Sequence, residues 1–172
     1  MDLKEAIERR HSIREFSNKS ISIEIINEIL EYANLAPSSG NLQARDFIIV
    51  DDDQQKIRLS KASLNQMFIS EAPYVIVVCA NLNRILPYGK RGIENYCIQD
   101  VAASVEHILL LAVDSGLGAC WIGAFNDNEV SKIIGCPKYI KPIALIPIGY
   151  PKGEIDKTSR KDIKSITHHN RW

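Results

Sequence analysis

The sequence ENYCIQDVAASVEHILLLAVDS, residues 94–115, is the longest helical pattern in the chain and limits how everything else can be arranged. Five apolar side chains at helical spacing mark one face: Val101, Val105, Ile108, Leu109 and Ala112. Five more make the other faces apolar: Ala102, Ala103, Leu110, Leu111 and Val113. A helix that is apolar nearly all round must be covered on several sides, which a chain of 172 residues achieves most easily by packing against a second copy. The stretch therefore predicts a homodimer.

Strand and helix patterns alternate along the chain around this helix. The strongest strand pattern is the continuous, β-branched run 74–80, and it predicts a central place in a sheet. Shorter strands are expected at 47–50, 120–122 and 143–148. Helices are expected at 2–10, 22–35 and 56–64, with a small one after Asn126. These patterns indicate a mixed α and β chain and a single domain over residues 1–172, and they leave the strand order open.

The composition excludes several classes of protein. Lys plus Arg and Asp plus Glu both number 21, so no net field draws the chain to nucleic acid or to an anionic membrane. The strongest apolar run, 108–113, is far too short to cross a bilayer, and the first residues contain no apolar signal core. We therefore expect a cytoplasmic protein that binds neither nucleic acid nor membrane.

The cysteines and histidines do not suggest a metal site or an acid–base site. The four cysteines, Cys79, Cys97, Cys120 and Cys136, form no C-x-x-C pair, which argues against a metal site. Three of the four lie in apolar surroundings, so small buried side chains are the main expectation and a reactive thiol the minor one. No nucleophile elbow, Walker loop or H-E-x-x-H motif is present. The glycines at 116 and 118 follow a helix and lack a third glycine, which argues against a Rossmann site.

Two predicted loops concentrate binding groups. Residues 9–14, Arg-Arg-His-Ser-Ile-Arg, offer three guanidiniums and a hydroxyl, which suit a phosphate. Residues 36–43, Ala-Pro-Ser-Ser-Gly-Asn-Leu-Gln, offer hydroxyls and carboxamides that can read the polar edge of a heterocycle. Either cluster alone fits a basic helix end or an ordinary turn. Together they indicate a phosphorylated ligand that carries a ring.

Four motifs in this order resemble the FMN-dependent nitroreductase-like oxidoreductases. They are RRHSIREF at 9–16, APSSGNLQ at 36–43, GLGACWIGAF at 116–125, and a closing SRK at 159–161 with HNRW at 169–172. The resemblance implies an α+β fold of three layers, α-β-α, with a mainly antiparallel sheet. It also implies an intertwined homodimer with two FMN sites at the subunit interface.

The resemblance assigns roles to particular residues. Around the phosphate, the ribityl chain and the pyrimidine edge it places Arg10, His11, Ser12, Arg14 and Arg160, with His11 contributing mainly backbone. From the opposite subunit it places Pro37, Ser38, Ser39 and Asn41 against the isoalloxazine or ribityl face. Near the ring it places Ile122, Gly123 and Ala124, with a backbone amide facing N5, and more loosely Asn65 or Gln66 at the polar edge.

The expected activity follows from the cofactor. Arginines can neutralise the FMN phosphate, and a cation near N1, for which Arg14 is the choice, stabilises the reduced ring. The resemblance implies that NAD(P)H delivers hydride through flavin N5 to a nitroaromatic, a quinone or a similar small acceptor by a ping-pong mechanism. No catalytic side chain is expected, because the flavin carries the chemistry. The alternative is a flavin-binding carrier or sensor without turnover.

The chain departs from the family pattern in two places. Gln43 is followed by Ala44-Arg45-Asp46, where the family often has Pro-Trp after the glutamine. No insertion of extra helices is evident between Pro87 and Tyr96, where larger members cover the active site. Both departures bear on the choice of acceptor.

Overall fold

The computed structural model describes residues 1–153 and 158–172, and its centre is an antiparallel sheet. The strands are β1 (Arg45–Val50), β2 (Tyr74–Asn81), β3 (Gly118–Ala119) and β4 (Ile140–Gly149), in the spatial order β1-β2-β4-β3. Every pair of neighbours is antiparallel. The central place predicted for the 74–80 run is confirmed, since β2 lies between β1 and β4.

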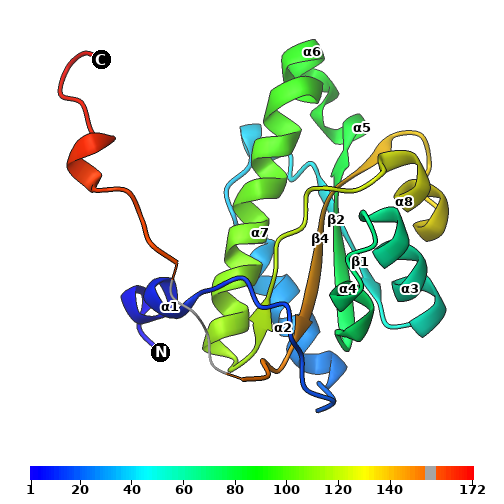
Figure 1. Ribbon diagram of the computed structural model, residues 1–172. Helices are drawn as coiled ribbons and strands as arrows, with labels where there is room; N and C mark the ends of the chain where they lie inside the picture. The colour runs from blue at the N-terminus through cyan, green and yellow to red at the C-terminus, as the bar shows by residue number, and fades with distance from the viewer. Residues whose placement is uncertain (154–157) are drawn as a thin grey trace.

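Helices cover both faces of this sheet, which gives three layers (Figure 1). On one face lie α2 (Ile23–Ala33) and the long α7 (Cys97–Asp114). On the other lie α3 (Asp53–Ala62), α4 (Phe68–Glu71) and α8 (Asp127–Ile134). Short turns α5 (Leu82–Ile85), α6 (Gly89–Arg91) and a π-helical turn (Gly92–Tyr96) join β2 to α7, and α1 (Leu3–Arg9) packs against α7. The predicted α+β class and α-β-α layering are confirmed.

Strand β2 shows why its sequence is apolar without alternation. Its even-numbered residues, such as Ile76 and Val78, join the cluster under α2 and α7. Its odd-numbered residues, such as Val75 and Val77, join the cluster under α3 and α8. Because successive side chains of a strand point to opposite faces, a strand covered on both sides needs apolar residues at every position.

The long helix α7 packs as its hydrophobic pattern predicts, but it begins at a later residue than expected. The five residues of the predicted core face are buried against the sheet, whereas the five on the other faces are only partly buried within one subunit. Residues 94–96 lie in the π-helical turn, so α7 starts three residues later than expected. By length and composition alone, the helical run Leu82–Asp114 could span a membrane. Its α7 part packs on the sheet as a core helix does.

The strand expected at 120–122 is wrong in position. The pairing residues are Gly118 and Ala119, opposite Gly149 and Ile148, and Ile122 forms only an isolated bridge with Leu145. The small helix after Asn126 is confirmed, since the Asn126 Oδ1 atom accepts from the Glu129 amide at 3.1 Å. Asparagine is a strong N-cap because its side chain satisfies one of the free amides of the first turn.

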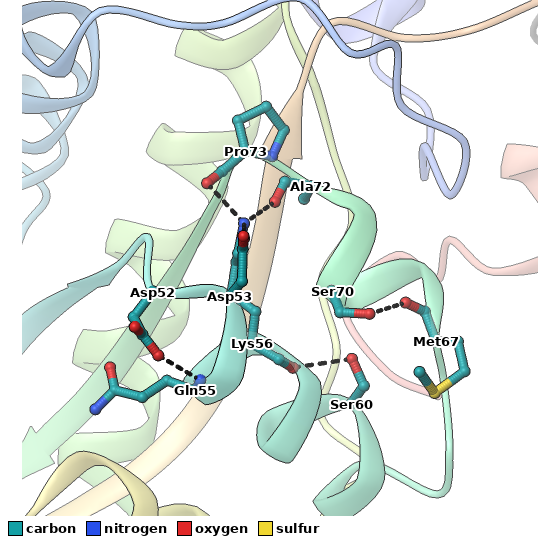
Figure 2. Close-up of polar contacts among 9 residues, drawn as sticks. All are labelled: Asp52, Asp53, Gln55, Lys56, Ser60, Met67, Ser70, Ala72 and Pro73. Atoms are coloured by element: carbon teal, nitrogen blue, oxygen red, sulfur yellow. Dashed lines mark hydrogen bonds and ion pairs between the residues drawn. The ribbon is translucent and has the colours of Figure 1, made fainter.

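A buried lysine fixes the junction between α4 and β2 (Figure 2). The Lys56 ammonium, on α3, donates to the carbonyl of Ala72 at 3.0 Å and to that of Pro73 at 3.3 Å. Its carboxylate partner, Asp53, is 3.0 Å away and largely in solvent. Asp52 caps α3 by accepting from the Gln55 amide at 2.7 Å. This anchor sets the position of α4, which borders the site described next.

The C-terminal segment lies apart from these layers. Residues 158–172 are exposed throughout, and in Figure 1 they extend away from the sheet past α1. Trp172 is 99% exposed, and its ring stacks on that of His168 at a centroid distance of 4.4 Å.

Candidate functional site

The residues after α1 form an extended segment along the β3 edge of the sheet. The Ile13 amide donates to the Ala119 carbonyl at 3.0 Å, and the Ser17 amide donates to the Tyr150 carbonyl at 2.8 Å. In an extended chain alternate side chains face opposite ways. Ile13 is accordingly buried, and the neighbouring Ser12 and Arg14 are exposed.

Two glycines let this segment approach the sheet closely. A Cβ at Gly118 would overlap the side chain of Ile13, and one at Gly149 would lie 2.7 Å from the Phe16 ring. Real Cβ atoms essentially never come that close. The absence of side chains at 118 and 149 therefore positions the segment that carries Ser12 and Arg14.

A pocket of about 550 Å³ opens where this segment meets the residues after β4. It is lined by Arg10, His11, Ser12, Ile13, Arg14, Glu15, Lys152, Gly153, Thr158 and Arg160. Four cations and one carboxylate make it electropositive, which favours an anion such as a phosphate. The structure thus brings together the residues predicted from the first and last motifs. We call this the cationic pocket.

The turn between α3 and α4 approaches the turn after β3 beside this pocket. Gln66 Nε2 donates to the Ser63 carbonyl at 2.9 Å and reaches the Ala124 carbonyl at 3.5 Å. The Arg14 guanidinium lies 6.0 Å from the centre of the Phe68 ring on α4. The Gln66 contact places Gln66 beside Ala124, and the Arg14 contact places one side chain of the cationic pocket against α4. Asn65 is exposed in the same turn, with a positive φ of 58°.

The prediction that a backbone amide of the turn at 122–124 faces flavin N5 needs one correction. Ile122 is buried, and its amide donates to the Leu145 carbonyl at 3.0 Å, so this amide cannot face a flavin. Gly123 and Ala124 are exposed, and within residues 1–153 and 158–172 their amides have no hydrogen-bond acceptor. They are the candidates that remain for a donor to N5.

The second motif lies at the opposite end of the sheet from the cationic pocket. Residues 34–43, here called the 34–43 loop, lead into β1, whose first residue pairs with Ala80 near the end of β2. The pocket lies beyond the other end of β2, where Tyr74 pairs with Ile148. Eight strand residues span roughly 25 Å at about 3.3 Å per residue. Within one chain the structure does not bring the loop's candidates, Pro37, Ser38, Ser39 and Asn41, to the pocket.

The 34–43 loop has a constrained backbone. Gly40, Asn41 and Gln43 all have positive φ values, of 56°, 56° and 50°. The Ser38 hydroxyl accepts from the Gln43 amide at 3.0 Å, which closes the turn. A Cβ at Gly40 would lie 2.5 Å from the Tyr88 hydroxyl, so Tyr88 lies directly over the loop.

Several residues of this region were missed by sequence reasoning. Arg45 and Asp100 are charged yet only 2% and 4% exposed, and both bond to the 34–43 loop. Lys152 lines the cationic pocket. The sequence does contain a sign that Arg45 is unusual, because this arginine stands where the family often has an apolar aromatic residue at the start of a buried strand. Nothing in the sequence pattern singles out Asp100 or Lys152.

The thiols lie away from solvent, as expected for three of them. Cys79, Cys97 and Cys120 are buried and Cys136 is half-buried. Burial raises the pKa of the Cys120 thiol, and the nearby Arg14 and Ser12 oppose that shift. His107 Nδ1 lies 3.4 Å from the Tyr32 carbonyl oxygen, which places this histidine in the contact between α7 and α2.

Comparisons with known proteins agree with this geometry. The model of the nitroreductase family matches residues 7–71 and 64–150. A relative from Archaeoglobus fulgidus that bears a nitroreductase name is 36% identical, over 86% of this chain and 84% of its own. An FMN reductase (NAD(P)H) of Bacillus subtilis is 28% identical, over 94% and 70%.

Solved structures show the same fold. A nitroreductase family protein from Clostridium novyi superposes with a TM-score of 0.80 at 32% identity, covering 88% of this chain and 86% of that one. NfrA2 of B. megaterium superposes with a TM-score of 0.92 at 27% identity, covering 98% and 74%. From these matches and from the motifs that the fold positions, we conclude that the chain belongs to the nitroreductase family.

Proposed function

We propose that two copies of this chain bind two FMN molecules between them and transfer hydride from NAD(P)H to a small acceptor in a ping-pong cycle. The chain is an NAD(P)H-dependent oxidoreductase of the nitroreductase family, and FMN is its cofactor. When bound, FMN supplies the redox chemistry by accepting hydride from the nicotinamide and passing it on. The observation that carries the proposal is the cationic pocket, built from both ends of one chain.

The pocket fits the phosphate end of FMN. Arg10, Arg160 and Lys152 bring three positive charges to its lining. Charge-assisted hydrogen bonds of this kind are about twice as strong as neutral ones, so these groups can hold a dianionic phosphate. The Ser12 hydroxyl lies among them and can bind the ribityl chain. Arg160 donates within its own segment to Thr158 at 2.7 Å, which pre-orients its guanidinium.

The ring end of the site lies toward Gln66, Gly123 and Ala124. The Gln66 carboxamide can read the polar edge of the isoalloxazine, and the exposed amides of Gly123 and Ala124 can donate to N5. Arg14 is held over Phe68 and supplies the positive charge that stabilises a negative charge near N1. These residues bind and orient, and the proposal assigns proton or nucleophile chemistry to none of them.

The 34–43 loop reaches this site from the other subunit. The loop and the pocket of one chain lie at opposite ends of β2, a strand of eight residues that spans roughly 25 Å, so we infer that one copy does not place both motifs on one FMN. The partly buried apolar faces of α7 offer a surface on which a second copy can pack. A dimer about this helix would bring the loop of each chain to the pocket of the other. The exposed segment 158–172 is long enough to reach the partner as well.

The acceptor is proposed as a nitroaromatic, a quinone or a similar small molecule. The relatives' names vary between nitroreductase, FMN reductase, chromium(VI) reductase and iodotyrosine deiodinase. Such variety agrees with a site in which the cofactor, rather than a dedicated side chain, performs the reaction.

Anaerobic reduction tests this function. Purified protein loaded with FMN is mixed with NADH or NADPH in a stopped-flow instrument, and absorbance near the flavin maximum is followed. We expect rapid bleaching by at least one nicotinamide, and parallel lines when initial rates are measured against both substrates. Bound flavin that neither nicotinamide reduces would instead indicate a carrier or sensor. Intersecting lines would refute the ping-pong order.

A further inference from the structure

We propose that Arg45 and Asp100 are positioning residues that hold the 34–43 loop in the shape that meets the cofactor of the partner subunit. The inference rests on the proposed function. It concerns two buried charged residues that the comparisons do not identify and that are too far from the cationic pocket of their own chain to touch its ligand.

Arg45 binds the backbone of the first half of the loop. Its Nη2 atom donates to the carbonyls of Asn34 at 2.6 Å and Ala36 at 2.7 Å, and its Nη1 atom donates to that of Pro37 at 3.3 Å. The planar guanidinium can satisfy several carbonyls at once, which an ammonium on a flexible stem does less well. Arg45 is only 2% exposed, and its buried guanidinium donates mainly to carbonyls of the loop.

Asp100 binds the second half of the loop from the first turn of α7. Its Oδ1 atom accepts from the Ser39 amide at 2.9 Å and from the Ser39 hydroxyl at 3.0 Å. Arg45 Nη1 also reaches the Asp100 carbonyl at 3.4 Å. Burial lowers the pKa of Arg45, and the negative charge of Asp100 opposes that shift. The two opposite charges attract each other beneath the loop, but among the described residues no ion pair joins them, and Arg45 Nε and Asp100 Oδ2 are buried without a hydrogen-bond partner.

The loop needs such a tether because its backbone is strained. Asn41 and Gln43 have side chains, and both adopt the left-handed region beside Gly40. Such conformations persist where surrounding contacts over-determine them. Without the tether, a smaller fraction of loops would have the binding-competent shape, and the apparent Kd for FMN would rise in inverse proportion to that fraction.

The contacts of Asp100 also fix the position of the loop relative to α7. Asp100 lies on the helix whose outer faces we propose as the subunit contact, one turn before Ser104. The position of the loop is thus fixed relative to the partner, which is where its proposed ligand lies.

Variants of both residues test the inference through FMN binding. We expect Asp100→Ala and Arg45→Met to raise the Kd for FMN at least about tenfold, by fluorescence titration of apoprotein. The matched controls are Ser104→Ala, which removes a buried hydroxyl on the same helix, and Val130→Ala, in the core of α8. Both controls should lower the Tm and leave the Kd within about twofold.

Conservative variants separate positioning from general destabilisation. Asp100→Asn keeps an oxygen for the Ser39 amide, so its Kd should stay within about threefold of wild type. Arg45→Lys keeps the charge and loses the fork, so its affinity should remain low. If Arg45→Met does not fold, the comparison of Asp100→Ala with Asp100→Asn decides. Wild-type affinity in Asp100→Ala would overturn the inference, whereas wild-type protein that binds no FMN would refute the proposed function itself.

Discussion

At the scale of single residues, Arg10 offers a direct test of the phosphate site. Arg10→Ala removes one charge-assisted contact of roughly 1.5–3 kcal/mol, so the Kd for FMN should rise by about one to two orders of magnitude. Arg9→Ala is the matched control, because Arg9 is exposed and pairs with Glu5 at 3.0 Å on α1. Fluorescence titration measures both, and thermal unfolding should show that neither variant loses its fold. Equal affinities would remove Arg10 from the site.

A second consequence at this scale concerns alkaline pH. Burial raises the pKa of Cys79, so its thiol stays protonated in the folded chain at a pH where the unfolded chain has lost the proton. Above about pH 8.5 the unfolded state binds fewer protons, and the free energy of unfolding must fall as pH rises. Cys79→Ala removes this contribution. Urea unfolding between about pH 8 and 10 should therefore show a shallower decline in the variant than in wild type, whatever their difference at neutral pH.

At the scale of elements, the extended segment on β3 depends on Gly118. Gly118→Ala should displace Ile13 and with it Ser12 and Arg14, so both the Tm and the affinity for FMN should fall. Gly123→Ala is the counterpart, because nothing lies within 4 Å of a Cβ there. It should leave the Tm unchanged and weaken FMN binding alone, since the added methyl faces the proposed ring. Differential scanning fluorimetry of apoprotein and an FMN titration distinguish the two outcomes.

The sequence predicts a helix or a strand correctly where one or both faces of that element are buried. The helix around Val105 and the strand around Val77 follow directly from hydrophobic pattern, since burial alone decides them. The pairing of Gly118 was not readable, because glycine has no strand preference and its place is set by the approach of Ile13. Tertiary contact overrode local preference there.

The candidate site divides in the same way. Arg10 and Arg160 could be predicted because charged clusters and motif spacing survive in the sequence, and the structure places both in one pocket. The role of Asp100 could not be predicted, since Asp100 lies 61 residues along the chain from Ser39, the loop residue that it binds. Contacts of that range become visible only once the fold is known.

At the scale of the whole molecule, the proposed sharing of each site between two subunits predicts complementation between defective subunits. A homodimer of Arg10→Ala is damaged in both pockets, and one of Asn41→Ala in both loops. In a mixed dimer, one site receives both defects and the other receives neither. Differently tagged subunits purified as a mixed dimer should therefore bind FMN at half the wild-type stoichiometry with wild-type affinity. Sites built within one chain would give two weakened sites and no recovery.

The separation of the cationic pocket and the 34–43 loop within one chain also links retention of the coenzyme to protein concentration. A coenzyme held by two polypeptides loses the contacts of one of them when they separate, so its release and their dissociation are coupled equilibria. Diluting the FMN-loaded protein should release the coenzyme progressively, seen as a rise in free-flavin fluorescence, and added free coenzyme should shift the midpoint of that release to lower protein concentration. The prosthetic group would then stabilise the association of the two subunits as well as serve as the redox centre.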